Sequence, residues 1–117
     1  MRPFILIATR ADNDVADAEY EQFLRFGGLT ESDLHRIRLE AGPLPELSLA
    51  DYSGIMIAGS PFTGSDPIES KSETQLRVEL EMSNLLTQVV AGDIPLLGAC
   101  YGVGTLALHQ GLSLIHI

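Results

Sequence analysis

Short apolar runs alternate along the chain with longer stretches in which apolar residues recur every three or four positions. Continuous apolar runs of this kind are typical of strands that are buried on both faces of a parallel sheet. The second run, HRIRLE, is less apolar than the others. We expect four strands, near residues 3–9, 35–39, 54–58 and 95–99.

Helical spacing follows the first and the third of these runs. The acidic cluster at 12–14 offers N-caps for a helix that Gly27 and Gly28 bring to an end. Ser72, with Gln75 three residues later, forms a capping-box pattern at the start of a second helix, which Gly92 and Pro95 close. The stretch AGPLPELSLADY is predicted to be a loop, and YGVGTLALHQ begins a further helix after the fourth strand.

Alternating strands and helices predict a single α/β domain with a parallel sheet and right-handed crossovers. The 117 residues contain no internal repeat and no interdomain linker. In open sheets of this class, binding sites lie at the carboxyl ends of the strands. Gly59 and Cys100, at the ends of the third and fourth strands, are therefore candidate site residues.

Composition and charge narrow the function classes. Hydrophobic residues make up 45% of the chain and charged residues 20%, which suits a packed globular domain. The net charge of −9 disfavours binding to nucleic acid or to anionic membrane surfaces. No apolar run approaches the length of a membrane span, and the first residues do not form a signal peptide. A single cysteine cannot form an internal disulfide, so we expect a cytoplasmic location.

That single cysteine lies in PLLGACYGVGTLALHQG, between glycines at the point where a strand is expected to become a helix. Gly98-Ala99-Cys100-Tyr101-Gly102 has the form of a nucleophile elbow, in which a sharp turn presents the nucleophile above the sheet. The dipole of the following helix would lower the pKa of the Cys100 thiol, and the Tyr101 N–H would face a developing oxyanion. A lone cysteine is usually inert core filler, but this placement favours the elbow.

Gly59 is the second candidate, within IMIAGSP. It stands where a strand ends and the chain turns, so its N–H is a candidate second oxyanion donor. Gly-Ser-Pro is also common turn chemistry, and the residues alone leave both interpretations open.

Together these residues resemble the class I (triad) glutamine amidotransferases. PLLGACYGVGTLALHQG is similar to the nucleophile stretch of that family, and IMIAGSP is similar to its oxyanion loop, about forty residues earlier. The chain differs from the usual family pattern at Ala58, where the loop has a first glycine, and at Gly104, where a glutamine is frequent.

The resemblance implies a flavodoxin-like open parallel sheet with helices on both faces. It also implies hydrolysis of the glutamine side-chain amide through a cysteine thioester, with ammonia passed to an acceptor on a synthase domain or subunit. Cys100 would be the nucleophile, and Gly59 and Tyr101 would supply the oxyanion-hole amides. Gly59, Ser60 and Gly104 would contact glutamine. No cofactor and no metal are expected.

The family takes its base and orienting carboxylate from a His-x-Glu stretch downstream of the cysteine. Here none of the three histidines is followed two residues later by Glu or Asp. We therefore interpret residues 1–111 as the N-terminal part of an amidotransferase domain, truncated at its C-terminus, and expect the printed chain to be inactive. Residues 112–117, LSLIHI, are interpreted as a non-native tail, with a short strand as the alternative. The alternative functions are a related γ-glutamyl hydrolase and a non-catalytic flavodoxin-like binding or interaction module.

Overall fold

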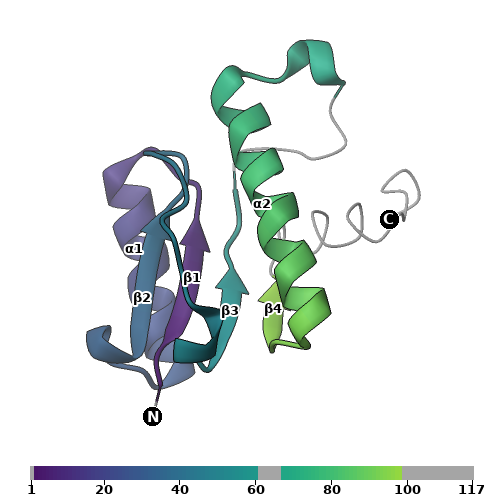
Figure 1. Cartoon of the computed structure of the whole chain (residues 1–117). Helices are drawn as coiled ribbons and strands as arrows, with labels where there is room; N and C mark the ends of the chain where they lie inside the picture. Colours follow the sequence, from purple (N-terminus) through teal and green to yellow (C-terminus); the bar gives the residue numbers. More distant parts are fainter. Residues whose placement is uncertain (1, 61–66, 99–117) are drawn as a thin grey trace, which may run out of the picture.

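A computed structural model describes residues 2–60 and 67–98 of the chain. Four strands form one parallel sheet in the order β2-β1-β3-β4 (Figure 1). The strands are β1 (Phe4–Ala8), β2 (Leu34–Arg38), β3 (Gly54–Ile57) and β4 (Leu96–Gly98). Each predicted strand is confirmed, and each bound lies within one residue of the expected one.

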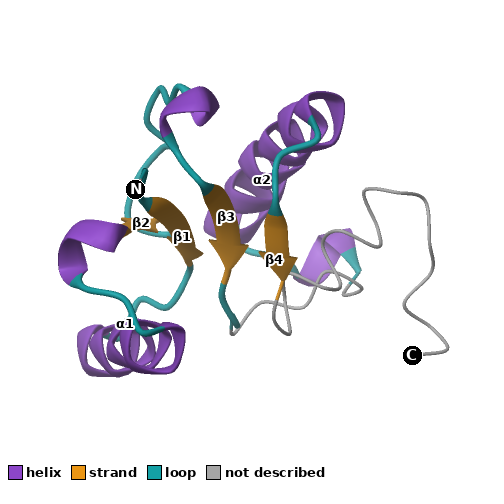
Figure 2. Cartoon of the chain, turned by 90° about the horizontal axis from the view of Figure 1, so that it is seen from below, coloured by secondary structure: helices purple, strands orange, loops and turns teal. Residues whose placement is uncertain are grey.

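Two α-helices flank this sheet on opposite faces, as Figure 2 shows. They are α1 (Asn13–Gly27), between β1 and β2, and α2 (Glu73–Gly92), between β3 and β4. Single 3-10 turns lie at Glu31–Asp33, Leu49–Asp51 and Ile68–Ser70. The sheet order and the two helical layers confirm the flavodoxin-like α/β fold.

Local capping explains where the two helices begin and end. The Asp12 carboxylate accepts the N–H groups of Asp14 and Val15 at 3.0 and 3.2 Å, and Gly28 ends α1 in the left-handed conformation with φ of 65°. The Ser72 hydroxyl accepts the Gln75 N–H at 3.1 Å at the start of α2. Asp93, rather than a glycine, takes the left-handed conformation after α2, with φ of 50°.

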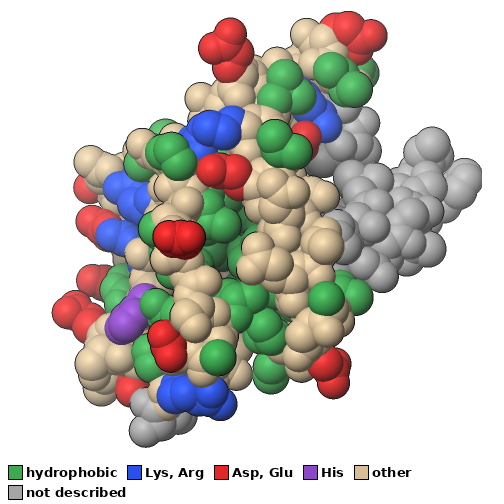
Figure 3. Space-filling view, viewed as in Figure 1, with side chains coloured by type: hydrophobic (Ala, Val, Ile, Leu, Met, Phe, Trp, Pro, Cys, Tyr) green, Lys and Arg blue, Asp and Glu red, His purple; other side chains and the backbone are tan. Residues whose placement is uncertain are grey.

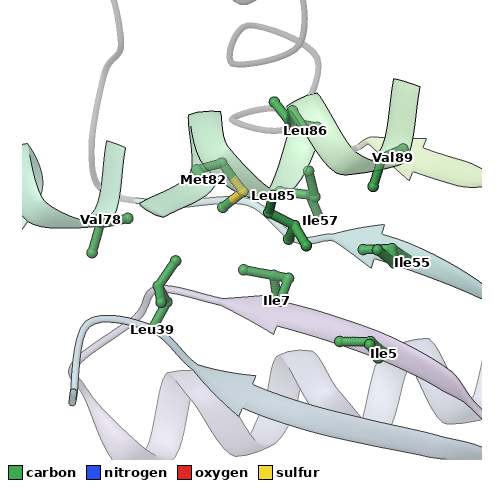
Figure 4. Packing of buried hydrophobic residues seen from close by; sticks show 10 residues of the cluster. All are labelled: Ile5, Ile7, Leu39, Ile55, Ile57, Val78, Met82, Leu85, Leu86 and Val89. Carbon is green, nitrogen blue, oxygen red and sulfur yellow. The ribbon is translucent and has the colours of Figure 1, made fainter. Parts of the chain in front are cut away.

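The larger part of the core lies between the sheet and α2. Val78 of α2 lies near Leu39, just beyond the carboxyl end of β2, and Val89 lies near Ile55 of β3, so the helix runs antiparallel to the strands (Figure 4). Burial of these side chains is the main stabilising contribution on this face, at about 25 cal/mol for each Å² of apolar surface removed from water. Ten buried side chains form this cluster: Ile5, Ile7, Leu39, Ile55, Ile57, Val78, Met82, Leu85, Leu86 and Val89.

A smaller cluster on the opposite face packs against α1. Leu6, Leu34 and Ala58 are buried there, and the Tyr20 hydroxyl donates to the Leu34 carbonyl at 2.7 Å. Burial raises the pKa of the Tyr20 hydroxyl, the nearby Glu31 carboxylate raises it further, and the Arg36 guanidinium opposes both effects. The alternation of Ile5, Leu6 and Ile7 between the two clusters is the period of an extended strand.

The connection from β2 to β3 crosses the face of β1 without an α-helix, as predicted from its prolines. Arg77 of α2 donates to the carbonyls of Leu39 and Gly42 at 2.8 and 2.9 Å. Glu81, paired with Arg77 at 2.7 Å, accepts the Leu44 N–H at 3.0 Å. Helix α2 thus holds the start of this crossover segment through its own charged side chains.

None of the helices in the described ranges is both long enough and apolar enough to cross a membrane. His35 of β2 is exposed, and its ring meets the Tyr52 ring edge-on, with 5.8 Å between the ring centroids. Figure 3 shows acidic and basic side chains scattered over the visible face of the described chain.

Candidate functional site at the carboxyl edge of the sheet

The strand register defines the edge at which the predicted site residues belong. Ile7 of β1 pairs with Ile57 of β3, and Ile57 pairs with Gly98 of β4. In the sequence, Thr9, Gly59 and Cys100 each follow two residues after a member of this row. Strands β3 and β4 are direct neighbours, so their last residues, Ile57 and Gly98, lie side by side at this edge.

Of the predicted site residues, Gly59 and Ser60 lie in the described part of the chain. Gly59 is buried directly after β3, and Ser60 is partly exposed and already engaged in an interaction. The Ala58 N–H donates to the Ile7 carbonyl at 3.0 Å, so pairing with β1 continues up to the residue before Gly59. Cys100, Tyr101 and Gly104 lie outside the described residues, and their roles stay predictions.

Thr9 is a residue of this edge that the sequence analysis did not single out. It is 2% exposed and directly follows β1, where the Leu39 N–H donates to the Ala8 carbonyl at 2.8 Å. Its hydroxyl oxygen is buried and has no hydrogen-bond partner among residues 2–60 and 67–98. Strand alternation places Thr9 on the face of Ile5 and Ile7. The available signal was the first polar side chain after an apolar strand, at the point where strand order reverses.

The first turns of α2 bring a polar network to the same end of the sheet. Gln75, 6% exposed, precedes Val78 by three residues and so continues the buried stripe of the helix past the strand ends. The Gln75 amide donates to Glu79 at 3.2 Å, and the Lys71 ammonium donates to the same carboxylate at 2.8 Å. Gln75 and Thr9 are the two buried polar residues in ranges 2–60 and 67–98.

The loop between β1 and α1 is fixed at this edge by Arg38, at the end of β2. Its guanidinium donates to the carbonyls of Arg10 and Ala11 at 2.8 and 3.1 Å and to the Asn13 side chain at 2.7 Å. Arg10 in turn pairs with Glu19 of α1 at 3.0 Å. The loop beside Thr9 is therefore held by several hydrogen bonds, which keeps the end of β1 in a defined position.

An apolar hollow lies elsewhere, on the α1 face of the sheet. Met56 and Leu97, which pair in register on β3 and β4, form its floor beside the end of α1. Its lining offers no titratable side chain: Gln22, Phe23, Phe26, Gly27, Met56 and Leu97. Across the described residues, no group of three His, Cys, Asp or Glu side chains could hold a metal ion.

Comparison with known proteins supports the fold. No protein-family model matches the chain, and no curated protein matches it either. A glutamine amidotransferase from Methylobacillus flagellatus is 18% identical, with a TM-score of 0.61 over 95% of this chain and 39% of that chain. A glutamine amidotransferase from Thermotoga maritima is 20% identical, with a TM-score of 0.63 over 95% of this chain and 44% of that chain.

Both similarities are structural, because the sequence identities are too low to carry more than the fold. The chain spans less than half the length of either protein. The shared part includes the parallel sheet, and both of these structural neighbours are glutamine amidotransferases.

Proposed function

We propose that this chain carries the nucleophile and oxyanion side of a glutamine amidotransferase site. The observation that supports the proposal is the register of Ile57 with Gly98 on neighbouring strands, because Gly59 and Cys100 each follow these residues by two positions in the sequence. Neighbouring strands lie about 4.8 Å apart, so one small amide can reach both residues. The two amidotransferases that share the fold support the same assignment.

In the proposed reaction, the Cys100 thiolate attacks the side-chain carbonyl carbon of glutamine. The carbonyl oxygen becomes an oxyanion, which the backbone N–H groups of Gly59 and Tyr101 stabilise. The carbon–nitrogen bond then breaks, the nitrogen takes up a proton and leaves as ammonia, and a γ-glutamyl thioester remains. Water hydrolyses the thioester to glutamate and regenerates the thiol, while ammonia passes to an acceptor on a synthase domain or subunit.

His35 does not serve this reaction as the base. It pairs in register with Ile5, near the amino ends of the strands, whereas Gly59 follows the carboxyl end of β3. The other two histidines, His109 and His116, lie outside the described residues. A test of the proposal should therefore require only a reactive thiol and a glutamine-shaped site.

Alkylation by a chloroketone analogue of glutamine meets this requirement, because the thiolate displaces chloride without protonating a leaving amine. We expect saturable labelling of Cys100 in the full chain, measured by intact mass, with protection by glutamine and none by asparagine. Cys100→Ser, which removes the only thiol, is the control for the labelling position. Labelling that is not saturable and not slowed by glutamine contradicts the proposal and favours the non-catalytic module.

A further inference from the structure

Thr9 lies on the strand next to β3, at the level of Gly59. The row Ile7, Ile57 and Gly98 is continuous across β1, β3 and β4, and Thr9 and Gly59 follow its first two members by two residues. The proposed nucleophile, Cys100, follows Gly98 by the same distance in the sequence. A buried hydroxyl without a partner has given up its hydrogen bonds to water without forming one to the protein. Such groups are rare in folded proteins. Its position at the topological switch point of the sheet is where ligands bind in this class of fold.

The distance between these strands matches the length of the proposed substrate. From β4 to β1 is two strand spacings, roughly 9.6 Å. An extended glutamine measures about 5 Å from its side-chain carbonyl carbon to its α-carboxylate carbon. Contacts of about 3 Å at each end extend its reach to about 11 Å. One glutamine can therefore lie across the strand ends, with its amide at β4 and its amino-acid end at β1.

We propose, resting on the function proposed above, that the Thr9 hydroxyl donates a hydrogen bond to the α-carboxylate of glutamine. The hydroxyl has a proton to donate, and a carboxylate is the acceptor with which such a bond is strongest. The carboxylates of the described residues near this edge, Glu19, Glu40 and Glu79, form ion pairs with Arg10, Arg38 and Lys71, although one buried oxygen of Glu19 and one of Glu40 make no hydrogen bond there. Thr9 would then select an α-amino acid over a simple amide, while Cys100 and Gly59 act on the side chain.

The test compares Thr9→Val with wild type in the full chain, using the glutamine chloroketone and the same reagent without its α-carboxylate. Valine keeps the shape of threonine and removes the hydroxyl. We expect the inhibition constant of the complete reagent to rise about tenfold or more. The constant of the decarboxylated reagent should not change, because it lacks the acceptor. Thr9→Ser, which keeps the hydroxyl, should remain within about twofold of wild type.

Two measurements separate this binding role from a structural one. Thr87→Val makes the same chemical change on the exposed surface of α2 and should alter neither constant. Alkylation of Thr9→Val by iodoacetamide, which has no amino-acid group, should proceed at the wild-type rate, with no loss of thermal stability. A parallel loss of stability or of iodoacetamide reactivity would assign Thr9 a structural role and overturn the proposal.

The outcomes also separate this inference from the proposed function. Glutamine-protected labelling of wild type, with unchanged constants in Thr9→Val, overturns the role of Thr9 alone. Wild-type labelling that glutamine does not slow overturns the proposed function and the role of Thr9 with it. A tenfold effect limited to the reagent that carries the carboxylate supports both.

Discussion

Ile57 of β3 lies opposite Gly98 of β4, in the same register that sets Ile57 opposite Ile7 of β1. This row crosses the three strands on the carboxyl side of the sheet, and the chain beyond it leads to residues of the proposed site. The geometry of the site therefore depends on residues that hold β1, β3 and β4 in register.

Gly54, at the start of β3, leaves no room for a side chain. A Cβ there would lie 3.0 Å from the Pro95 carbonyl oxygen and 3.3 Å from the Phe4 ring. Gly54→Ala should lower the free energy of unfolding by about 1–3 kcal/mol, because Phe4 belongs to β1 and the Pro95 carbonyl is held by the Ile55 N–H, so neither can easily move. Gly42→Ala is the matched control, since nothing lies within 4 Å of its Cβ position. Equal urea midpoints for the two variants would contradict the prediction.

Arg77 ties α2 to the crossover segment through backbone carbonyls. Arg77→Met removes donors from the carbonyls of Leu39 and Gly42 and the ion pair with Glu81, at a cost of about 2 kcal/mol. Arg36→Met is the control variant. The partner of Arg36, Asp17, is 63% exposed, so the decrease in the free energy of unfolding should stay below about 1 kcal/mol. Denaturant unfolding measures the free energy of unfolding of both variants. A larger decrease for Arg36→Met than for Arg77→Met would show that the Arg77 hydrogen bonds contribute little.

Asp12 caps α1 by accepting two backbone N–H groups. Asp12→Ala should lower the free energy of unfolding by about 1 kcal/mol. Asp14→Ala removes a nearby charge from the first turn but not the cap, so its effect should be at the lower end of about 0.3–1 kcal/mol. Thermal unfolding of the two variants in parallel decides whether capping or charge matters more.

Asp33 makes stability depend on acid pH. Hydrogen bonds from the Thr30 backbone and then from its side chain hold the pKa of the Asp33 carboxyl below its ordinary value of 3.8. The folded state therefore binds the proton less readily than the unfolded chain does. Its stabilising contribution is present above pH 3.8 and is lost as the pH falls through the lowered pKa. Asp33→Asn should show a smaller drop in melting temperature between about pH 5 and pH 3; an unchanged pH profile would argue against this linkage.

The strands were predictable because each is a short apolar run, a pattern that depends only on local sequence. The cap at Gly28 was predictable for the same reason. The left-handed residue after α2 was not, since Gly92 stands immediately before Asp93 and is the usual residue type for that conformation. The remaining features depend on contacts between residues that are far apart in the sequence, so local patterns could not predict them. The bond from Arg77 to Leu39 spans 38 residues, and the importance of Thr9 appears only once the pairing of three strands is known. The nucleophile elbow at Cys100 stays a prediction.

The hydrogen bonds between α2 and the segment that connects β2 to β3 affect the order in which the chain folds during synthesis. The Leu44 N–H and the Gly42 carbonyl find their partners on Glu81 and Arg77, 37 and 35 residues further along the chain. A ribosome adds about 5–20 residues each second, so Arg77 and Glu81 are synthesised seconds after the crossover segment that they bind. Until α2 has emerged, β1 and β2 can pair while the face that α2 later covers remains open to water. During that interval, the segment that carries β1, β2 and the crossover is the part whose apolar face a chaperone would encounter.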